Sequence, residues 1–142
     1  MEIFIEGPVS PQLIADTISG FQAENQVGAQ NIFLGQIRAD HVDGKRVAAI
    51  AYTAYSEMVS NKMEEIKTKV FELFDIQDFR ILHSLGKISV GEICLFILTT
   101  AGHRKDAIAA TNYILEAIKK ELPIFGKELF EDDSHQWKVN RF

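Results

Sequence analysis

Cysteine is nearly absent from this chain: among 142 residues there is one, Cys94. An internal disulfide is therefore excluded. Cys94 lies in the apolar run 92–98, which is typical of a buried strand, whereas a reactive thiolate needs an electropositive and partly exposed site. We therefore expect an inert core thiol. One cysteine and four scattered histidines show no spacing of zinc ligands, so we expect no metal and no cofactor.

Other absences narrow the class of protein. No apolar run is long enough to span a bilayer, and the net charge of -5 does not suggest a general binder of nucleic acids or membranes. The chain has no glycine-rich phosphate loop of the Walker or Rossmann type and no Gly-x-Ser-x-Gly elbow. Its first six residues alternate without a basic region, unlike a signal peptide, so we expect a cytoplasmic protein.

The composition is that of a globular protein, with 46% apolar and 25% charged residues, and the length favours one domain spanning residues 1–142. Alternation predicts strands, and a period of about 3.6 residues predicts helices. The expected elements are, in chain order, a strand at 2–6, a helix from Ser10-Pro11 to Gly20, strands at 28–37 and 47–54, a helix at 55–73, strands at 78–83 and 91–100, a helix at 103–121, an extended piece at 124–130 and a tail from Trp137.

Two connections carry predictions of their own. The charged loop 38–46 contains the turn signal Asp43-Gly44, so the strands on either side of it are expected to pair as a hairpin. Residues 84–87 are expected to join the next two strands. This order predicts an α+β fold with a mainly antiparallel sheet, three helices and a small C-terminal β extension.

Basic residues at the ends of elements are the candidates for chemistry. His103 and Arg104 open a helix, where free N–H groups and the dipole suit a phosphate; a capped helix start with both side chains in water is the alternative. Lys119 and Lys120 lie in the last turn, where the dipole alone favours lysine, and a working lysine would need partial burial to lower its pKa. Arg38 ends an apolar strand and is either an anion ligand or a solvated strand end.

Distance separates these candidates along one helix. At 1.5 Å per residue, positions 103 and 119 lie about 24 Å apart. One small-molecule pocket within a single subunit cannot use both ends. Either one end is idle, or the pocket lies between two copies of the chain.

Five groups of motifs, taken in order, resemble the large, catalytic subunit of molybdopterin synthase. The resemblance runs from about residue 1 to Trp137. The matching segments are Val27-Gly28-Ala29 with Phe33-Leu34-Gly35-Gln36-Ile37-Arg38; Ala51-Tyr52-Thr53-Ala54-Tyr55 with Met58; Ile81-Leu82-His83-Ser84-Leu85-Gly86 with Val90-Gly91-Glu92; Ala101-Gly102-His103-Arg104 with Ala107; and Ile118-Lys119 with Leu122-Pro123-Ile124-Phe125 and Lys127-Glu128.

The resemblance implies an α/β hammerhead-like fold and an activity, sulfur transfer. Family members convert cyclic pyranopterin monophosphate into molybdopterin, which carries a dithiolene. The sulfur arrives as a thiocarboxylate on the C-terminal Gly-Gly tail of a ubiquitin-like small subunit, and the assembly is a heterotetramer around a homodimer of large subunits. An enzyme that receives sulfur on a partner's tail needs no persulfide cysteine of its own, which agrees with the single cysteine here.

The resemblance also implies the site. Lys119 is the expected catalytic residue: it would contact the thiocarboxylate and act as acid or base as the cyclic phosphate opens. The expected substrate-binding residues are Arg38, Phe33, Arg141 and, from the second copy of the chain, His103 and Arg104. A pocket shared between two copies would resolve the 24 Å separation along the helix.

The chain departs from the family near its end. The usual ending is Pro-(Ile/Phe)-Trp-Lys-(Lys/Arg)-Glu, and here Phe125 replaces the Trp and Gly126 stands where an active-site lysine is expected. Lys127 is the expected catalytic substitute, although an extended strand points it the opposite way unless a bulge at Gly126 re-aims it. Ser84 and Thr53 replace a common Arg and Glu. The alternative is a non-catalytic paralogue that dimerises and binds the Gly-Gly tail without turnover.

Overall fold

The computed structural model describes residues 1–139. Its elements are β1 (Phe4–Glu6), α1 (Pro11–Phe21), β2 (Ala29–Gln36), β3 (His41–Val42), β4 (Lys45–Ala54), α2 (Ser56–Leu73), β5 (Asp78–Ser89), β6 (Ile93–Ala101), α3 (Arg104–Glu121), β7 (Ile124–Phe130) and β8 (His135–Trp137). Within residues 1–139 the eight strands form one mainly antiparallel sheet, which confirms the α+β prediction. The main strand order is β2-β6-β5-β4-β7-β8, with β1 parallel to β5 and β3 beside β4.

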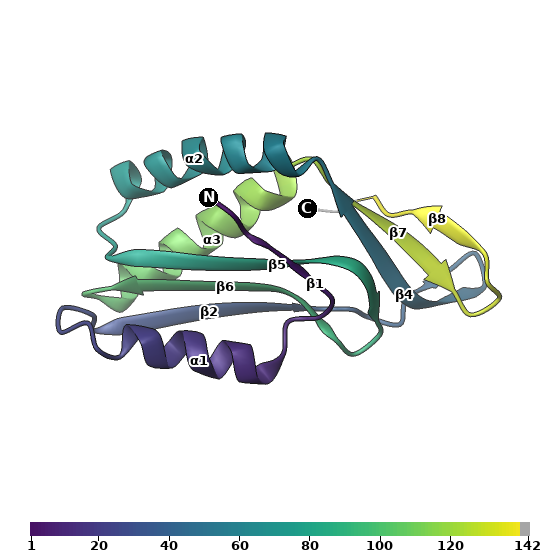
Figure 1. The fold of residues 1–142 in the computed structure, drawn as a ribbon, viewed down its shortest axis with the longest axis horizontal. Helices are drawn as coiled ribbons and strands as arrows, with labels where there is room; N and C mark the ends of the chain where they lie inside the picture. Colours follow the sequence, from purple (N-terminus) through teal and green to yellow (C-terminus); the bar gives the residue numbers. More distant parts are fainter. Residues whose placement is uncertain (140–142) are drawn as a thin grey trace.

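The sheet separates two apolar layers. Helix α1 lies on one side of the sheet, and α2 and α3 lie on the other (Figure 1). Along β6, Leu95 and Ile97 belong to the main core, which also holds the apolar stripes of α2 and α3. Phe96 and Leu98, which alternate with them, belong to a smaller core beneath α1. The two-residue period of a strand thus places α1 on one face and α2 and α3 on the other. None of the helices within residues 1–139 is long and apolar enough to cross a membrane.

The predicted hairpin between residues 28–37 and 47–54 is wrong. β2 pairs with β6 along its whole length and does not neighbour β4. The turn at Asp43 and Gly44, with φ of 52° and 78°, instead joins the two-residue β3 to the start of β4. A turn signal such as Asp-Gly describes only about four consecutive residues. Asp43-Gly44 therefore predicted a real turn, but it could not predict which strand pairs with β2.

The connection predicted at residues 84–87 is also wrong, because these residues lie inside β5. Residues 78–83 of β5 pair with β6, whereas residues 86–89 pair with β4. Gly86 lies at this change of partner with φ of 88°, a left-handed conformation that glycine adopts without steric cost. From this bend the strands β4, β7 and β8 extend away from the helices as an arm (Figure 1).

Candidate active site

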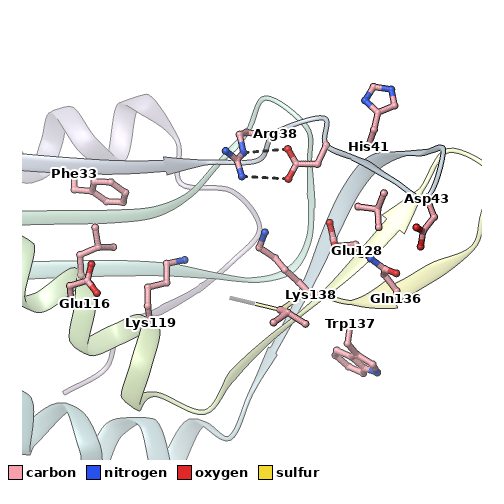
Figure 2. Close-up of a pocket in the computed structure, with 14 residues that line it drawn as sticks. Phe33, Arg38, His41, Asp43, Glu116, Lys119, Glu128, Gln136, Trp137 and Lys138 are labelled. Atoms are coloured by element: carbon pink, nitrogen blue, oxygen red, sulfur yellow. Dashed lines mark hydrogen bonds and ion pairs between the residues drawn. The ribbon is translucent and has the colours of Figure 1, made fainter. Parts of the chain in front are cut away.

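A cavity of about 870 Å³ lies where the end of α3 meets the arm (Figure 2). Two smaller cavities of about 340 and 330 Å³ share part of its wall. Lys119 and Lys138 line all three, and no other residue in the range 1–139 does. The main cavity also takes walls from β2 and its following loop (Phe33, Arg38, Asp40, His41), from α3 (Leu115, Glu116) and from the arm (Glu128, Gln136, Trp137).

Lys119 projects into the cavity from the last turn of α3, directly after the buried Ile118. Burial within the cavity wall is the largest cause that lowers the pKa of Lys119; Cys94 acts in the opposite sense, and the charge of Lys138 lowers it further. The next residue, Lys120, forms an exposed pair with Glu116 at 3.6 Å and lines none of the three cavities. The orientation of α3 about its own axis therefore points Lys119, and not Lys120, into the cavity. The lowered pKa of Lys119 suits proton transfer.

Three weakly polar side chains form the floor beneath Lys119. The hydroxyl of Tyr52 lies 3.7 Å from the sulfur of Cys94, which in turn lies 3.5 Å from the carbonyl oxygen of Gly35. The Tyr52 ring meets the His83 ring edge-on, with centroids 5.0 Å apart. The Nδ1 atom of His83 lies 2.8 Å from the carbonyl oxygen of Ser84, so Nδ1 carries the hydrogen and donates it.

Burial keeps this floor uncharged near neutral pH. It lowers the pKa of His83 to about 4 and raises the pKa values of Tyr52 and Cys94. Cys94 is 8% exposed, as expected for a core thiol. With a neutral floor, the cations that can attract an anion are Arg38, Lys119 and Lys138 on the walls. The same walls carry the carboxylates Asp40, Asp43, Glu116 and Glu128, and Asp40 is paired with Arg38.

Arg38 and Phe33 lie on the β2 side of the cavity. The Arg38 side chain is exposed and forms a two-point pair with Asp40, with Nε to Oδ1 at 3.4 Å and Nη2 to Oδ2 at 3.5 Å (Figure 2). Phe33 is half-buried and lines two of the three cavities. The structure therefore brings both predicted residues to the same cavity as Lys119.

His103 and Arg104 lie at the other end of α3 and line none of these cavities. His103 is the N-cap residue, with extended backbone, and its side chain makes no capping hydrogen bond. Both side chains are exposed. Within one chain they are not brought to Lys119.

Lys127 lies on the opposite face of β7 from the cavity. The register between β4 and β7 shifts between Val47 and Ala49, and it runs without a bulge through Gly126. The Nζ of Lys127 lies 5.7 Å from the centroid of the Trp137 ring, and Lys127 lines none of the three cavities. Arg141, the other residue predicted near the end, lies outside the described residues.

Sequence reasoning missed four residues of the site: Tyr52, His83, Glu128 and Lys138. Tyr52 and His83 stand in the motifs that carry the resemblance, yet nothing in an apolar strand pattern marks a side chain as part of a cavity floor. Glu128 is 6% exposed and accepts from Gln136 Nε2 at 3.3 Å. Lys138 follows an exposed tryptophan in a tail that carried no periodic signal, and β8 alone places it at the cavity.

The fold and the site define the class of protein. A cavity presents lysines and an arginine to an anionic ligand above a neutral floor, at one end of an α+β sheet. No group of three or more His, Cys, Asp or Glu side chains within residues 1–139 is arranged to hold a metal ion. Cationic side chains in a partly desolvated cavity are an arrangement that enzymes use to bind anionic reactants and to stabilise negative charge.

Comparison with known proteins identifies the family. A family model described as MoaE protein matches residues 5–121. The molybdopterin synthase catalytic subunit of Bos taurus is 30% identical over 132 residues, 93% of this chain and 69% of that protein, and the one of Pyrococcus abyssi is 32% identical over 81% of this chain and 76% of that protein. Some relatives are longer: the chain covers 36% of the Drosophila willistoni protein.

Solved structures agree with this assignment. Molybdopterin synthase from Staphylococcus aureus superposes with a TM-score of 0.84 at 27% identity, covering 98% of this chain and 97% of that one. The complex of subunits 1 and 2 of the molybdopterin-converting factor from Helicobacter pylori shares the fold, with a TM-score of 0.81 at 19% identity, 98% of this chain and 90% of that one. The chain belongs to the MoaE family, the catalytic subunits of molybdopterin synthase. This family assignment makes the chain a sulfurtransferase of molybdopterin synthesis.

Proposed function

We propose that the cavity around Lys119 binds cyclic pyranopterin monophosphate and receives the thiocarboxylate tail of a ubiquitin-like small subunit. The observation that carries this proposal is the position of Lys119, a partly desolvated amine at the meeting point of three cavities. Both reactants are anions, one through its phosphate and the other through its thiocarboxylate. A cation in a site poor in water binds such groups and stabilises charge that develops during the reaction.

The chemistry divides between the tail and the cavity. A dithiolene contains two sulfur atoms, so two thiocarboxylate tails each transfer one sulfur. Each sulfur bonds to a substrate carbon as an oxygen substituent leaves that carbon, water then cleaves the acyl–sulfur bond, and the tail leaves as a carboxylate. Lys119 contacts the thiocarboxylate and transfers a proton as the cyclic phosphate opens. Cys94 is the only cysteine of the chain, and burial raises the pKa of its thiol. Without a thiolate to relay sulfur, transfer runs directly from the tail to the pterin substrate.

A second copy of the chain completes the site by supplying His103 and Arg104 to the phosphate. The support is geometric: these residues open α3, Lys119 lies in its last turn, and about 24 Å of helix separates them. In a two-fold dimer, the N-terminus of α3 in one subunit faces the C-terminus of α3 in the other subunit. With one small subunit on each large subunit, the assembly is a heterotetramer. The Helicobacter pylori complex of two different subunits supports a protein partner for this fold.

Mixed dimers test the shared site. Lys119→Ala and Arg104→Ala are each expected to be inactive alone, but in a mixed dimer one of the two sites carries both native side chains. Statistical mixing makes half of the dimers mixed, so activity returns to about one quarter of that of the wild type. No recovery, with exchange of subunits verified by mass spectrometry, would show that both residues act within one chain.

The role of Lys119 is tested by single-turnover conversion with a thiocarboxylated small subunit. Lys119→Ala should abolish formation of the dithiolene, whereas Lys120→Ala, which removes an exposed neighbour paired with Glu116, should leave the rate near that of the wild type. Equal rates for the two variants would reject Lys119 as the catalytic residue. If the wild type binds the tail and makes no product, the non-catalytic alternative holds.

Three further assignments complete the proposal. Lys127 stays a predicted catalytic residue, for which Lys127→Ala in the same assay is the test, and Arg141 stays a predicted substrate ligand. A cytoplasmic location is supported by the single free cysteine, which needs no oxidising compartment. Fractionation of cells that express a tagged chain tests the location.

A further inference from the structure

Lys138 lies on the wall that faces Lys119. Its backbone N–H donates to the carbonyl oxygen of Gly126 at 2.8 Å. The adjoining pairs of the same ladder are Lys127 with Trp137 and Glu128 with Gln136. Lys138 is thus the cross-strand neighbour of Gly126, and the side chains of such a pair occupy the same face of the sheet.

Gly126 leaves this part of the wall without a side chain of its own. A Cβ at this position would lie 3.1 Å from Cγ2 of Ile50 and 3.2 Å from Cε1 of Tyr52, which is tighter than ordinary packing. The ring of Tyr52 therefore packs over the bare backbone of β7. An amine on this wall comes from the next strand, β8, and not from β7 itself.

The charge of Lys138 acts inside the cavity. Figure 2 shows Lys119 and Lys138 pointing into it from α3 and from the arm. Lys138 is half-buried, and its charge lowers the pKa values of both Lys119 and Cys94. Two like charges directed at one space repel each other, and an anion bound between them relieves the repulsion. The neighbouring Lys127 makes no such contribution, because it lies over Trp137 on the other face.

We propose that Lys138 is a substrate-binding residue, whose ammonium clamps an anionic group of the reactants against Lys119 on the facing wall. The inference rests on the proposed function of the cavity and adds a residue to it. The bound group is an oxyanion or thioanion, and the two reactants offer one each: the phosphate of the pterin and the thiocarboxylate of the tail. Lys138 supplies, from β8, the amine on this face that Gly126 does not carry.

The test compares Lys138→Ala, Lys138→Arg and, as a matched surface control, Lys120→Ala, each checked for native thermal unfolding. Three quantities are measured: the single-turnover rate, the affinity for cyclic pyranopterin monophosphate alone, and the affinity for the small subunit with an intact tail and with the Gly-Gly removed. Lys138→Ala should lower the rate or one of the affinities by about tenfold or more, the effect of losing one hydrogen bond to a charged group. Lys138→Arg should recover most of the loss, because it keeps the charge.

The outcomes separate the sources of the anion. A loss of affinity for the pterin alone assigns Lys138 to the phosphate, and a loss seen only with the intact tail assigns it to the thiocarboxylate. The inference is overturned if Lys138→Ala matches Lys120→Ala in all three quantities while Lys119→Ala is inactive. If Lys119→Ala is itself fully active, the proposed function of the cavity fails first, so the two failures are distinguishable.

Discussion

The titration of His83 measures how strongly the site excludes water. The residue is 4% exposed, its Nδ1–H donates to the carbonyl of Ser84, and the ring of Tyr52 packs edge-on against it. Burial lowers the pKa of His83 to about 4; the hydrogen bond to Ser84 acts in the opposite sense, and the charge of Lys119 adds to the lowering. A folded protein should therefore keep this imidazole neutral well below neutral pH.

The lowered pKa has a consequence for stability. The unfolded chain binds this proton near pH 6.5, whereas the folded chain binds it only near pH 4. Between these values the unfolded state holds more protons, so the free energy of unfolding falls as the pH falls. At 1.36 kcal/mol per pKa unit, the loss between pH 7 and pH 4 is about 3 kcal/mol. The stability linked to the neutral His83 is fully present above pH 6.5, and it is lost as the pH falls toward 4.

Two measurements check this prediction. Imidazole resonances followed by NMR should show one histidine that titrates near pH 4, and in Lys119→Met its pKa should rise yet stay below 6.5, because burial is the larger cause. Urea unfolding at pH 7 and pH 4 should show that His83→Gln loses less stability on acidification than the wild type, by about 3 kcal/mol. A folded-state pKa of 6.5, or identical pH dependence in the two proteins, would refute the reasoning.

Three further predictions follow from the same geometry. Because burial lowers the pKa of Lys119 from 10.5, the single-turnover rate should fall with rising pH at a value below 10.5, where Lys119 loses its proton; a fall at 10.5 or above contradicts the burial. A Cβ on Gly28 would lie 2.2 Å from the carbonyl oxygen of Gly102, so Gly28→Ala should cost roughly 2–3 kcal/mol in chemical denaturation. Gly20→Ala, in a helix with open space around it, should instead gain about 0.5–1 kcal/mol, and equal effects of the two substitutions would contradict the packing. Cys94→Ala should retain sulfur transfer, since the sulfur arrives on the tail, and a loss of about tenfold would point to a role for the thiol.

Local patterns were enough to predict most elements and the family. The period of about 3.6 residues in residues 55–73 and 103–121 predicted α2 and α3 to within one residue at each end. The extended piece expected at residues 124–130 after Pro123 is β7. These signals succeed because the repeat of a helix or strand is encoded in consecutive residues. The five groups of motifs that carry the resemblance lie in these elements and at their ends, and each is a run of neighbouring residues, so the family could be recognised before the fold.

These local patterns did not predict which strands pair when they lie far apart in the sequence. The partner of β2 is β6, whose paired residues lie 57 to 72 positions further along the chain. Gly86 inside β5 is where that strand changes partner. The site depends on the same long-range choices. The apolar stripe of the helix does not choose between Lys119 and Lys120; the resemblance named Lys119, and the packing of α3 points its side chain into the cavity. Lys138 reaches the cavity because β8 returns beside β7, and strand pairing of this kind depends on contacts across the whole chain, which no local repeat encodes.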